Sequence, residues 1–178
     1  AFVDFFCPNE RAATVTYFVN PGRHIFAEGV KLAERKIAIR PDEHKAQLDL
    51  PLRHFNANDV RIADFTGDGK HDALIVWMDQ AGLQLQRGDG KGNFTHHSMT
   101  QAGRDAAFFG IGDFNQDQSK DFVVTHWQQD FVTVGLNDGA GHFMLRRYPA
   151  GNGSYGVSVA DFDRDGHLDF VTANYRAR

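Results

Sequence analysis

The sequence predicts an all-β fold assembled from repeats. A nine-residue acidic loop occurs three times, and each copy lies between two short apolar runs rich in β-branched and aromatic residues. The first acidic loop is DFTGDGKHD (residues 64–72), the second is DFNQDQSKD (113–121) and the third is DFDRDGHLD (161–169). They begin 49 and 48 residues apart, and regular spacing of this length is typical of repeat architectures.

Each repeat contains four short candidate strands. They are expected at residues 60–63, 73–78, 83–87 and 95–99 in one repeat, and at residues 107–112, 122–126, 131–136 and 144–148 in the next. Residues 131–136 (FVTVGL) alternate as a half-buried strand does. Four short strands in about 48 residues predict the blade of a β-propeller, and the 18 glycines and 16 phenylalanines suit its turns and its inter-sheet packing.

A second landmark follows each acidic loop and fixes the alignment of the repeats. The glycine-rich turns GDGKGNF (88–94) and NDGAGHF (137–143) end in phenylalanines that lie 22 residues after the last aspartate of the preceding loop. A degenerate copy of the turn ends at Phe26, and the same count places Asp4 at the last position of a loop that is otherwise missing. The chain is therefore expected to begin within a repeat.

The alignment divides residues 1–178 into one propeller segment of about three to four blades. We expect a partial blade at 1–58, full blades at 59–106 and 107–154, and a partial blade at 155–178. Residues 28–55 form an insertion in which 30–36 suits a turn of helix and 37–40 an outer strand. The insertion either carries a function of its own or merely decorates the sheet. A ring needs 4 to 8 blades, so the rest of a longer propeller or self-association is expected to complete it.

The acidic loops have the oxygen-rich pattern of a calcium site. Oxygen-bearing side chains stand at positions 1, 3, 5 and 9, and a glycine at position 6 of the first and third loops permits a sharp turn. The opening resembles an EF-hand loop, but its position 12 is Thr172 in the third copy, within an apolar strand instead of a helix. One such segment is usually a solvated turn, whereas three in register favour metal binding.

The composition narrows the range of partners. The net charge is −4 without basic clusters, so nucleic acid is not an expected partner. No apolar run approaches the roughly 18 residues of a membrane-spanning helix. Cys7 is the only cysteine, so no intrachain disulfide can form. Hydrolase, metalloprotease and phosphate-binding motifs are missing from the sequence, which favours a chain that is not itself an enzyme.

The acidic loops and the glycine-rich turns that follow them resemble those of the FG-GAP/VCBS repeat family, which includes the calcium-bearing blades of integrin α-subunit propellers. The resemblance covers nearly the whole chain and is clearest from Asp59 to Tyr175. It implies a β-propeller, usually of seven blades, in which each calcium loop joins the first and second strands of a blade.

The resemblance also implies which residues bind calcium, at up to three sites. The expected ligands are Asp64, Thr66, Asp68, the Lys70 carbonyl and Asp72; Asp113, Asn115, Asp117, the Ser119 carbonyl and Asp121; and Asp161, Asp163, Asp165, the His167 carbonyl and Asp169. Thr66 replaces a charged ligand and Gln118 replaces the turn glycine, so the third site is expected to be the strongest. Magnesium is disfavoured because it demands near-ideal octahedral geometry.

The resemblance leaves the ligand of the module open. It implies a calcium-stabilised binding or adhesion module for a glycan or a protein, located in the secreted, periplasmic or cell-surface space, where weak calcium sites are filled. The alternative is a non-catalytic scaffold domain of a larger secreted enzyme, such as a polysaccharide lyase or hydrolase. Trp77, Trp127 and Tyr175 end equivalent strands and either stack on sugars or, as we favour, belong to the core between blades.

Overall fold

The structure of the chain is a computed structural model that describes residues 5–9, 14–19, 33–38, 57–77 and 82–175. These residues form thirteen strands, which confirms the predicted all-β class for the described part of the chain. In order they are β1 (Phe5–Asn9), β2 (Thr14–Val19), β3 (Ala33–Ala38), β4 (Ala57–Ala63), β5 (Asp72–Trp77), β6 (Gly82–Gly88), β7 (Phe94–Thr100), β8 (Ala106–Gly112), β9 (Asp121–His126), β10 (Phe131–Asn137), β11 (Phe143–Pro149), β12 (Ser154–Ala160) and β13 (Asp169–Asn174).

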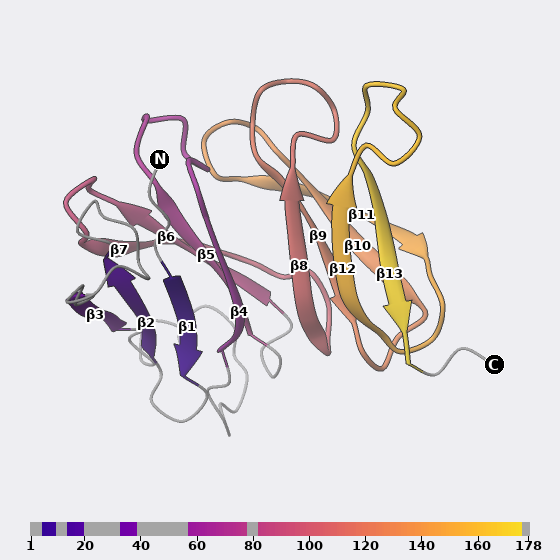
Figure 1. Cartoon of the computed structure of the whole chain (residues 1–178), viewed down its shortest axis with the longest axis horizontal. Coiled ribbons are helices and arrows are strands. Elements are labelled where there is room, and N and C mark those ends of the chain that lie inside the picture. Colours follow the sequence, from indigo (N-terminus) through magenta and orange to yellow (C-terminus); the bar gives the residue numbers. More distant parts are fainter. Residues whose placement is uncertain (1–4, 10–13, 20–32, 39–56, 78–81, 176–178) are drawn as a thin grey trace, which may run out of the picture.

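The strands form four antiparallel sheets that stand next to one another (Figure 1). The first sheet has the order β1-β2-β3, the two complete sheets are β4-β5-β6-β7 and β8-β9-β10-β11, and β12 pairs with β13 in the last. Neighbours in each sheet are also neighbours in the sequence, so every sheet is a simple meander. Each complete sheet corresponds to one sequence repeat.

The first strands of successive sheets lie along a common inner edge. Strand β4 packs beside β1 and β8, and β12 packs beside β8, whereas β7 and β11 are the last strands of their sheets (Figure 1). Two side chains of β4 cross to β8: the Asn58 amide donates to the Ala107 carbonyl at 2.6 Å, and Asp59 accepts a hydrogen bond from the Phe109 amide at 3.3 Å. The described sheets are arranged like neighbouring blades, but they do not close into a ring.

The eight strands predicted for the two full repeats are confirmed. Their observed ends differ from the predicted ends by no more than three residues, and the largest difference is at the start of β4. The middle strands β5 and β9 are buried along their whole length, which explains the runs of consecutive apolar residues at 73–77 and 122–124. Periodicity and turn chemistry were therefore sufficient to locate the sheets.

The predicted turn of helix at residues 30–36 is wrong where the structure describes it. Ala33 to Lys36 belong to β3, which pairs with β2 over its whole length, from Val19 opposite Ala33 to Thr14 opposite Ala38. The alanine, glutamate, arginine and lysine of this stretch favour a helix locally, but pairing along β2 outweighs that weak preference. The rest of the insertion, the Phe26 turn and Asp4 lie outside the described residues.

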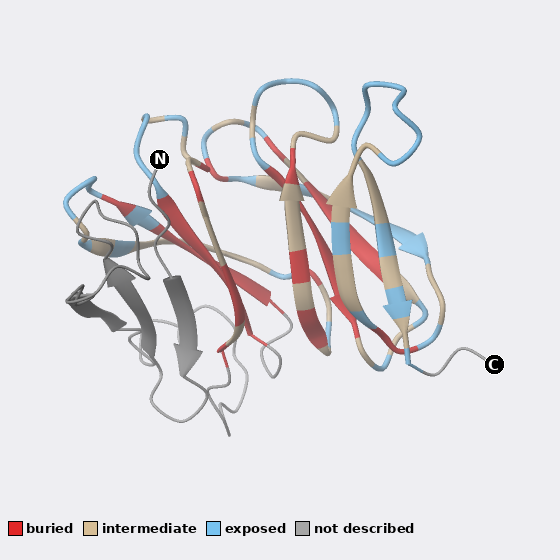
Figure 2. Cartoon of the chain, viewed as in Figure 1, coloured by how far each residue is buried: buried red, intermediate tan, exposed pale blue. Residues whose placement is uncertain are grey.

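Apolar side chains fill the space between adjacent sheets. Between the two complete sheets the buried residues include Leu74, Val76 and Leu85 from one repeat and Phe109, Phe122 and Val124 from the next. A further cluster around Val123, Val132 and Val134 packs against Val157, Val159 and Phe170 of the last sheet. Figure 2 shows this burial along β5, β6 and β9. Inter-sheet packing of this kind holds the repeats side by side.

The three aromatic residues that end equivalent strands occupy different environments. Trp77 has no exposed surface and packs with Ile75 and Ala73, so it belongs to the core. Trp127 is partly buried, and Tyr175 is 87% exposed. The core interpretation is confirmed for Trp77, and the three positions do not form a repeated aromatic surface.

Candidate metal centre

The three acidic loops follow the same backbone path. They connect β4 to β5, β8 to β9 and β12 to β13, at one end of the molecule (Figure 1). Positions 4 and 6 have positive φ in every copy: 69° and 78° at Gly67 and Gly69, 61° and 73° at Gln116 and Gln118, and 65° and 91° at Arg164 and Gly166. Since non-glycine residues rarely adopt these angles, the loop conformation is imposed even where glycine is lacking.

The aspartate at position 1 closes each loop on itself. Its carboxylate accepts hydrogen bonds from the backbone amides of positions 5 and 6. These are Asp68 (3.2 Å) and Gly69 (2.8 Å) to Asp64, Asp117 (3.0 Å) and Gln118 (2.8 Å) to Asp113, and Asp165 (3.2 Å) and Gly166 (3.0 Å) to Asp161. The carboxylate is thereby fixed in place, with acceptor capacity remaining for a cation.

The aspartate at position 9 ties the first two loops to their sheets. Asp72 is fully buried and accepts hydrogen bonds from the amides of Phe65 and Thr66 at 3.0 Å each, and of Gly88 at 2.9 Å. Asp121 is equally buried, accepts from Phe114 and Asn137 at 2.8 Å each, and has its pKa raised mainly by burial. This architectural role could not be predicted from the spacing of the ligands, because that spacing says nothing about amides on a distant turn.

The third loop brings three predicted ligands together. Asp161, Asp163 and Asp169 each place a carboxylate oxygen within 4.8 Å of the others. No other group of three or more acidic, histidine or cysteine side chains in the described part of the chain has this geometry. Calcium–oxygen bonds measure about 2.3–2.6 Å, so oxygens on opposite sides of one ion lie roughly 5 Å apart. Asp165 is not in the group; it accepts a hydrogen bond from the His167 amide at 2.8 Å.

Two cationic side chains already pair with the first loop. Asp68 forms ion pairs with Arg87 (2.9 Å) and Lys70 (3.4 Å), and the hydrogen bond from Arg87 lowers its pKa. Arg87 comes from β6, and no local sequence signal links it with the loop. The hydroxyl oxygen of Thr66 is shielded from solvent and has no hydrogen-bond partner among the described residues, which leaves it available as a ligand at position 3.

The second loop is held by amides instead of cations. Asp117 accepts hydrogen bonds from the Ser119 amide and the Asn115 side chain, each at 2.8 Å, and these bonds lower its pKa. The amide of position 7 donates to the aspartate of position 5 in all three loops. The predicted carbonyl ligands of Lys70, Ser119 and His167 lie at this position and stay predictions.

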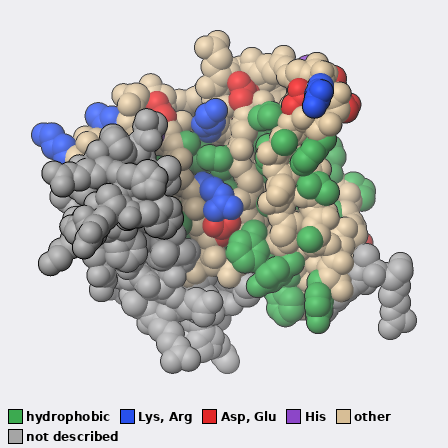
Figure 3. Space-filling model, in the orientation of Figure 1, with side chains coloured by type: hydrophobic (Ala, Val, Ile, Leu, Met, Phe, Trp, Pro, Cys, Tyr) green, Lys and Arg blue, Asp and Glu red, His purple; other side chains and the backbone are tan. Residues whose placement is uncertain are grey.

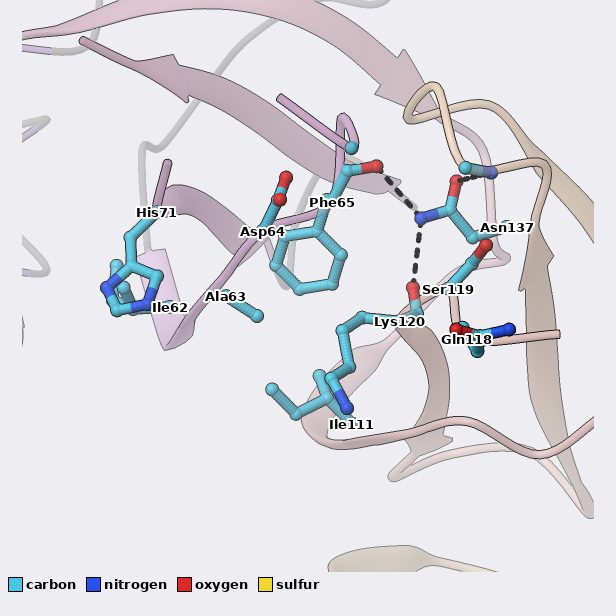
Figure 4. A pocket seen from close by; sticks show the side chains of 12 residues that line it. Ile62, Ala63, Asp64, Phe65, His71, Ile111, Gln118, Ser119, Lys120 and Asn137 are labelled. Atoms are coloured by element: carbon cyan, nitrogen blue, oxygen red, sulfur yellow. Dashed lines mark hydrogen bonds between the residues drawn. The ribbon is translucent and has the colours of Figure 1, made fainter. Parts of the chain in front are cut away.

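A cleft of about 450 Å³ separates the first and second loops (Figure 4). Asp64, Phe65 and His71 line one side, and Ser119 and Lys120 line the other. The lining mixes apolar and polar groups, and the two walls come from neighbouring repeats. The two acidic loops are therefore not independent surfaces of the protein.

The segments that match a known family begin at the acidic loops. A family model described as FG-GAP-like repeat matches residues 64–124 and again residues 113–172, so together the matches span more than half of the chain. The chain belongs to the FG-GAP-like repeat family. Each match begins at position 1 of an acidic loop and ends in the second strand of the following repeat. Membership in this family indicates a β-propeller-type binding module.

No curated protein matches the chain. Within the described residues, no helix has the length and apolar character required to cross a membrane.

Proposed function

We propose that the chain is a calcium-stabilised segment of a β-propeller that binds a glycan or a protein outside the cytosol. The observation that carries the proposal is the carboxylate group of the third loop, in a chain whose three acidic loops share one conformation. These loops are those of FG-GAP-like repeats, and the family often binds calcium. Secretion or display outside the cytosol follows from the weak sites expected, which need high calcium concentrations.

The ion would be held mainly by Asp161, Asp163 and Asp169 in the third loop. It would supply positive charge that offsets the repulsion among these carboxylates. The chain's own contribution is already in place, since the loop amides fix Asp161, and the Phe162 amide donates to Asp169 at 3.0 Å. Because the ion binds the folded loop and not the unfolded chain, its binding free energy adds to the stability of the fold.

The open side of the last sheet supports the remaining blades as a partner. Among the described residues, β13 pairs only with β12, whereas the complete sheets have four strands. Large apolar side chains are exposed on this sheet, in its connecting loop and just after it: Tyr155, Phe162, Leu168, Val171 and Tyr175. Met144 and Tyr148 are exposed on β11 of the preceding sheet. Figure 3 shows apolar side chains gathered on the half of the molecule that contains β12 and β13. Further blades, up to the usual seven, or a second copy would cover this surface.

The stabilising role of calcium is tested by thermal unfolding. The melting temperature with calcium should exceed that with chelator by several degrees, as expected for ligand binding to the native state. Asp163→Asn should reduce the difference, whereas Asp130→Asn, at an exposed position outside the loops, should not. Identical unfolding curves with calcium and with chelator would refute calcium stabilisation.

The nature of the ligand is tested separately. A glycan array and a pull-down from extracellular extracts, each performed with calcium and with chelator, distinguish a glycan from a protein partner. Calcium-dependent capture of a defined glycan or protein supports the binding module. The absence of any calcium-dependent ligand would contradict it and favour a scaffold role.

A further inference from the structure

A single buried side chain joins the first two acidic loops. Asn137 is 3% exposed and lies between the two walls of the cleft (Figure 4). Its amide nitrogen donates to the carbonyl of Phe65, at position 2 of the first loop, at 2.9 Å, and to the carbonyl of Lys120, at position 8 of the second loop, at 3.1 Å. One carboxamide therefore connects two loops whose sequences are 49 residues apart.

The remaining polar atoms of Asn137 are also occupied. Its side-chain oxygen accepts hydrogen bonds from the amides of Gly139 (3.2 Å) and Gly141 (3.1 Å), which fixes the turn between β10 and β11. Its backbone amide donates to Asp121, the predicted ligand at position 9 of the second loop. A buried amide with every donor and acceptor paired holds its neighbours in one arrangement, because any displacement leaves polar groups unsatisfied.

The preceding repeat has no such side chain. Gly88 is the equivalent of Asn137, and its amide makes the equivalent hydrogen bond to Asp72. A side chain cannot be added there, since a Cβ would lie 2.0 Å from the His71 carbonyl oxygen. The bridge is thus a property of the pair formed by the first and second loops, and not a requirement of the repeat itself.

We propose that Asn137 is a positioning residue that couples cation binding at the first and second acidic loops. The inference rests on the proposed calcium binding. An ion in the second loop would hold Asp121 and the adjoining Lys120 carbonyl in one position. Because Asn137 donates hydrogen bonds to the carbonyls of both Lys120 and Phe65, it would then hold Phe65 in a matching position. Asp72 accepts hydrogen bonds from the amides of Phe65 and Thr66. A fixed position of Phe65 therefore also fixes the predicted ligands Thr66 and Asp72 of the first loop.

The sharpest variant is Asn137→Asp. It preserves one oxygen for Gly139 and Gly141 but turns the donating nitrogen into an oxygen that faces two carbonyl oxygens. The added negative charge alone would strengthen calcium binding nearby, so weaker binding cannot be a charge effect. Asn137→Gly, which reproduces the residue of the preceding repeat, serves if the aspartate variant does not fold.

A matched control is available at the other end of the same sheets. Asn58 also joins the two repeats, by a hydrogen bond of 2.6 Å to Ala107, but it lies at the start of β4, far along the strand from the loop. Asn58→Ala should lower the melting temperature without altering calcium binding. It therefore separates a general weakening of the interface from the coupling assigned to Asn137.

The experiment is a calcium titration of the full chain followed by amide NMR at Thr66, Phe114 and Phe162, one reporter in each loop. In the native chain the first and second loops should saturate together. Asn137→Asp should shift the midpoint of the first loop roughly tenfold higher, within the usual range of coupling between sites, and leave the third loop unchanged. Unchanged midpoints, a calcium response confined to the third loop, or equal shifts in Asn58→Ala would overturn the coupling alone. A native chain with no calcium response in any loop would overturn the proposed function as well.

Discussion

The first and third acidic loops have the same backbone conformation but differ in the charges that surround their carboxylates. In the first, Asp68 is paired with Arg87 and Lys70, and Asp72 is buried under three backbone amides. In the third, Asp161, Asp163 and Asp169 converge, and no ion pair reaches them from any described residue. The first loop is thus largely stabilised by the protein itself, whereas the third retains uncompensated charge.

The loops therefore share one conformation although the charges around them differ from copy to copy. Hydrogen bonds from the backbone set the path of all three loops, and charge compensation is added in different ways. An arginine from the neighbouring strand does so in the first loop, and we propose a calcium ion in the third. The second loop has neither an arginine nor a convergent carboxylate group among its described residues, and it uses the Asn115 amide.

Replacing the aspartate at position 9 should separate the two loops most strongly. Asp72→Ala removes the acceptor of three backbone amides at a fully buried site and should lower the free energy of unfolding by about 3 kcal/mol, even in chelator. Asp169→Ala removes one hydrogen-bond acceptor at a partly exposed site and should have a small effect in chelator. Urea unfolding in chelator measures both, and equal losses would show that the two carboxylates have the same role.

Removing one ligand charge should affect calcium affinity at the third loop. Asp163→Asn lowers the charge of the convergent group and should raise the calcium concentration at half saturation roughly tenfold, since ligand charge tunes calcium affinity. Asp68→Asn, at position 5 of the first loop, should change total binding much less because Arg87 already compensates that carboxylate. Calorimetric titration distinguishes the two; the larger loss in Asp68→Asn would reverse the ranking of the sites.

The second loop tests how much backbone strain at the non-glycine positions lowers the stability of the fold. Gln118 has φ of 73° where the first and third loops have glycine, so Gln118→Gly should stabilise the fold by about 0.5–1 kcal/mol. Gln116→Gly relieves a similar angle but loses the hydrogen bond from Gln116 to the Gly166 carbonyl, and its gain should be smaller. Thermal unfolding compares them, and a destabilising Gln118→Gly would mean that its side chain contributes more than its backbone costs.

Much of this architecture was predictable from the sequence because it depends on local signals. Strand periodicity, glycine-rich turns and constant spacing located eight strands and three loops. The helix proposed for residues 30–36 failed because local propensity is a weak signal beside sheet pairing. The division into blades and the individual ligand assignments stay predictions.

The missed residues are those whose partners lie far along the chain. Arg87 is 19 residues from Asp68, and Asn137 is 72 residues from Phe65. Neither belongs to an acidic loop, and nothing in their local sequence indicates that a turn will bring them there. The alignment of the glycine-rich turns did contain one hint for Asn137. The turns GDGKGNF and NDGAGHF are similar, but the first has Gly88 where the second has Asn137.

The smallest expected effect tests whether Arg87 substitutes for a metal. Arg87→Gln removes the guanidinium that pairs with Asp68 and should lower the calcium concentration needed to fill the first loop by a few-fold, because the removed pair is exposed and screened by solvent. Arg146→Gln removes the same charge from an exposed position on β11 and should leave that concentration unchanged. The amide signal of Thr66 during a calcium titration reports the first loop directly. If both variants bind calcium as the native chain does, Arg87 does not compete with the ion, and the weakness of the first site must come from Thr66 instead.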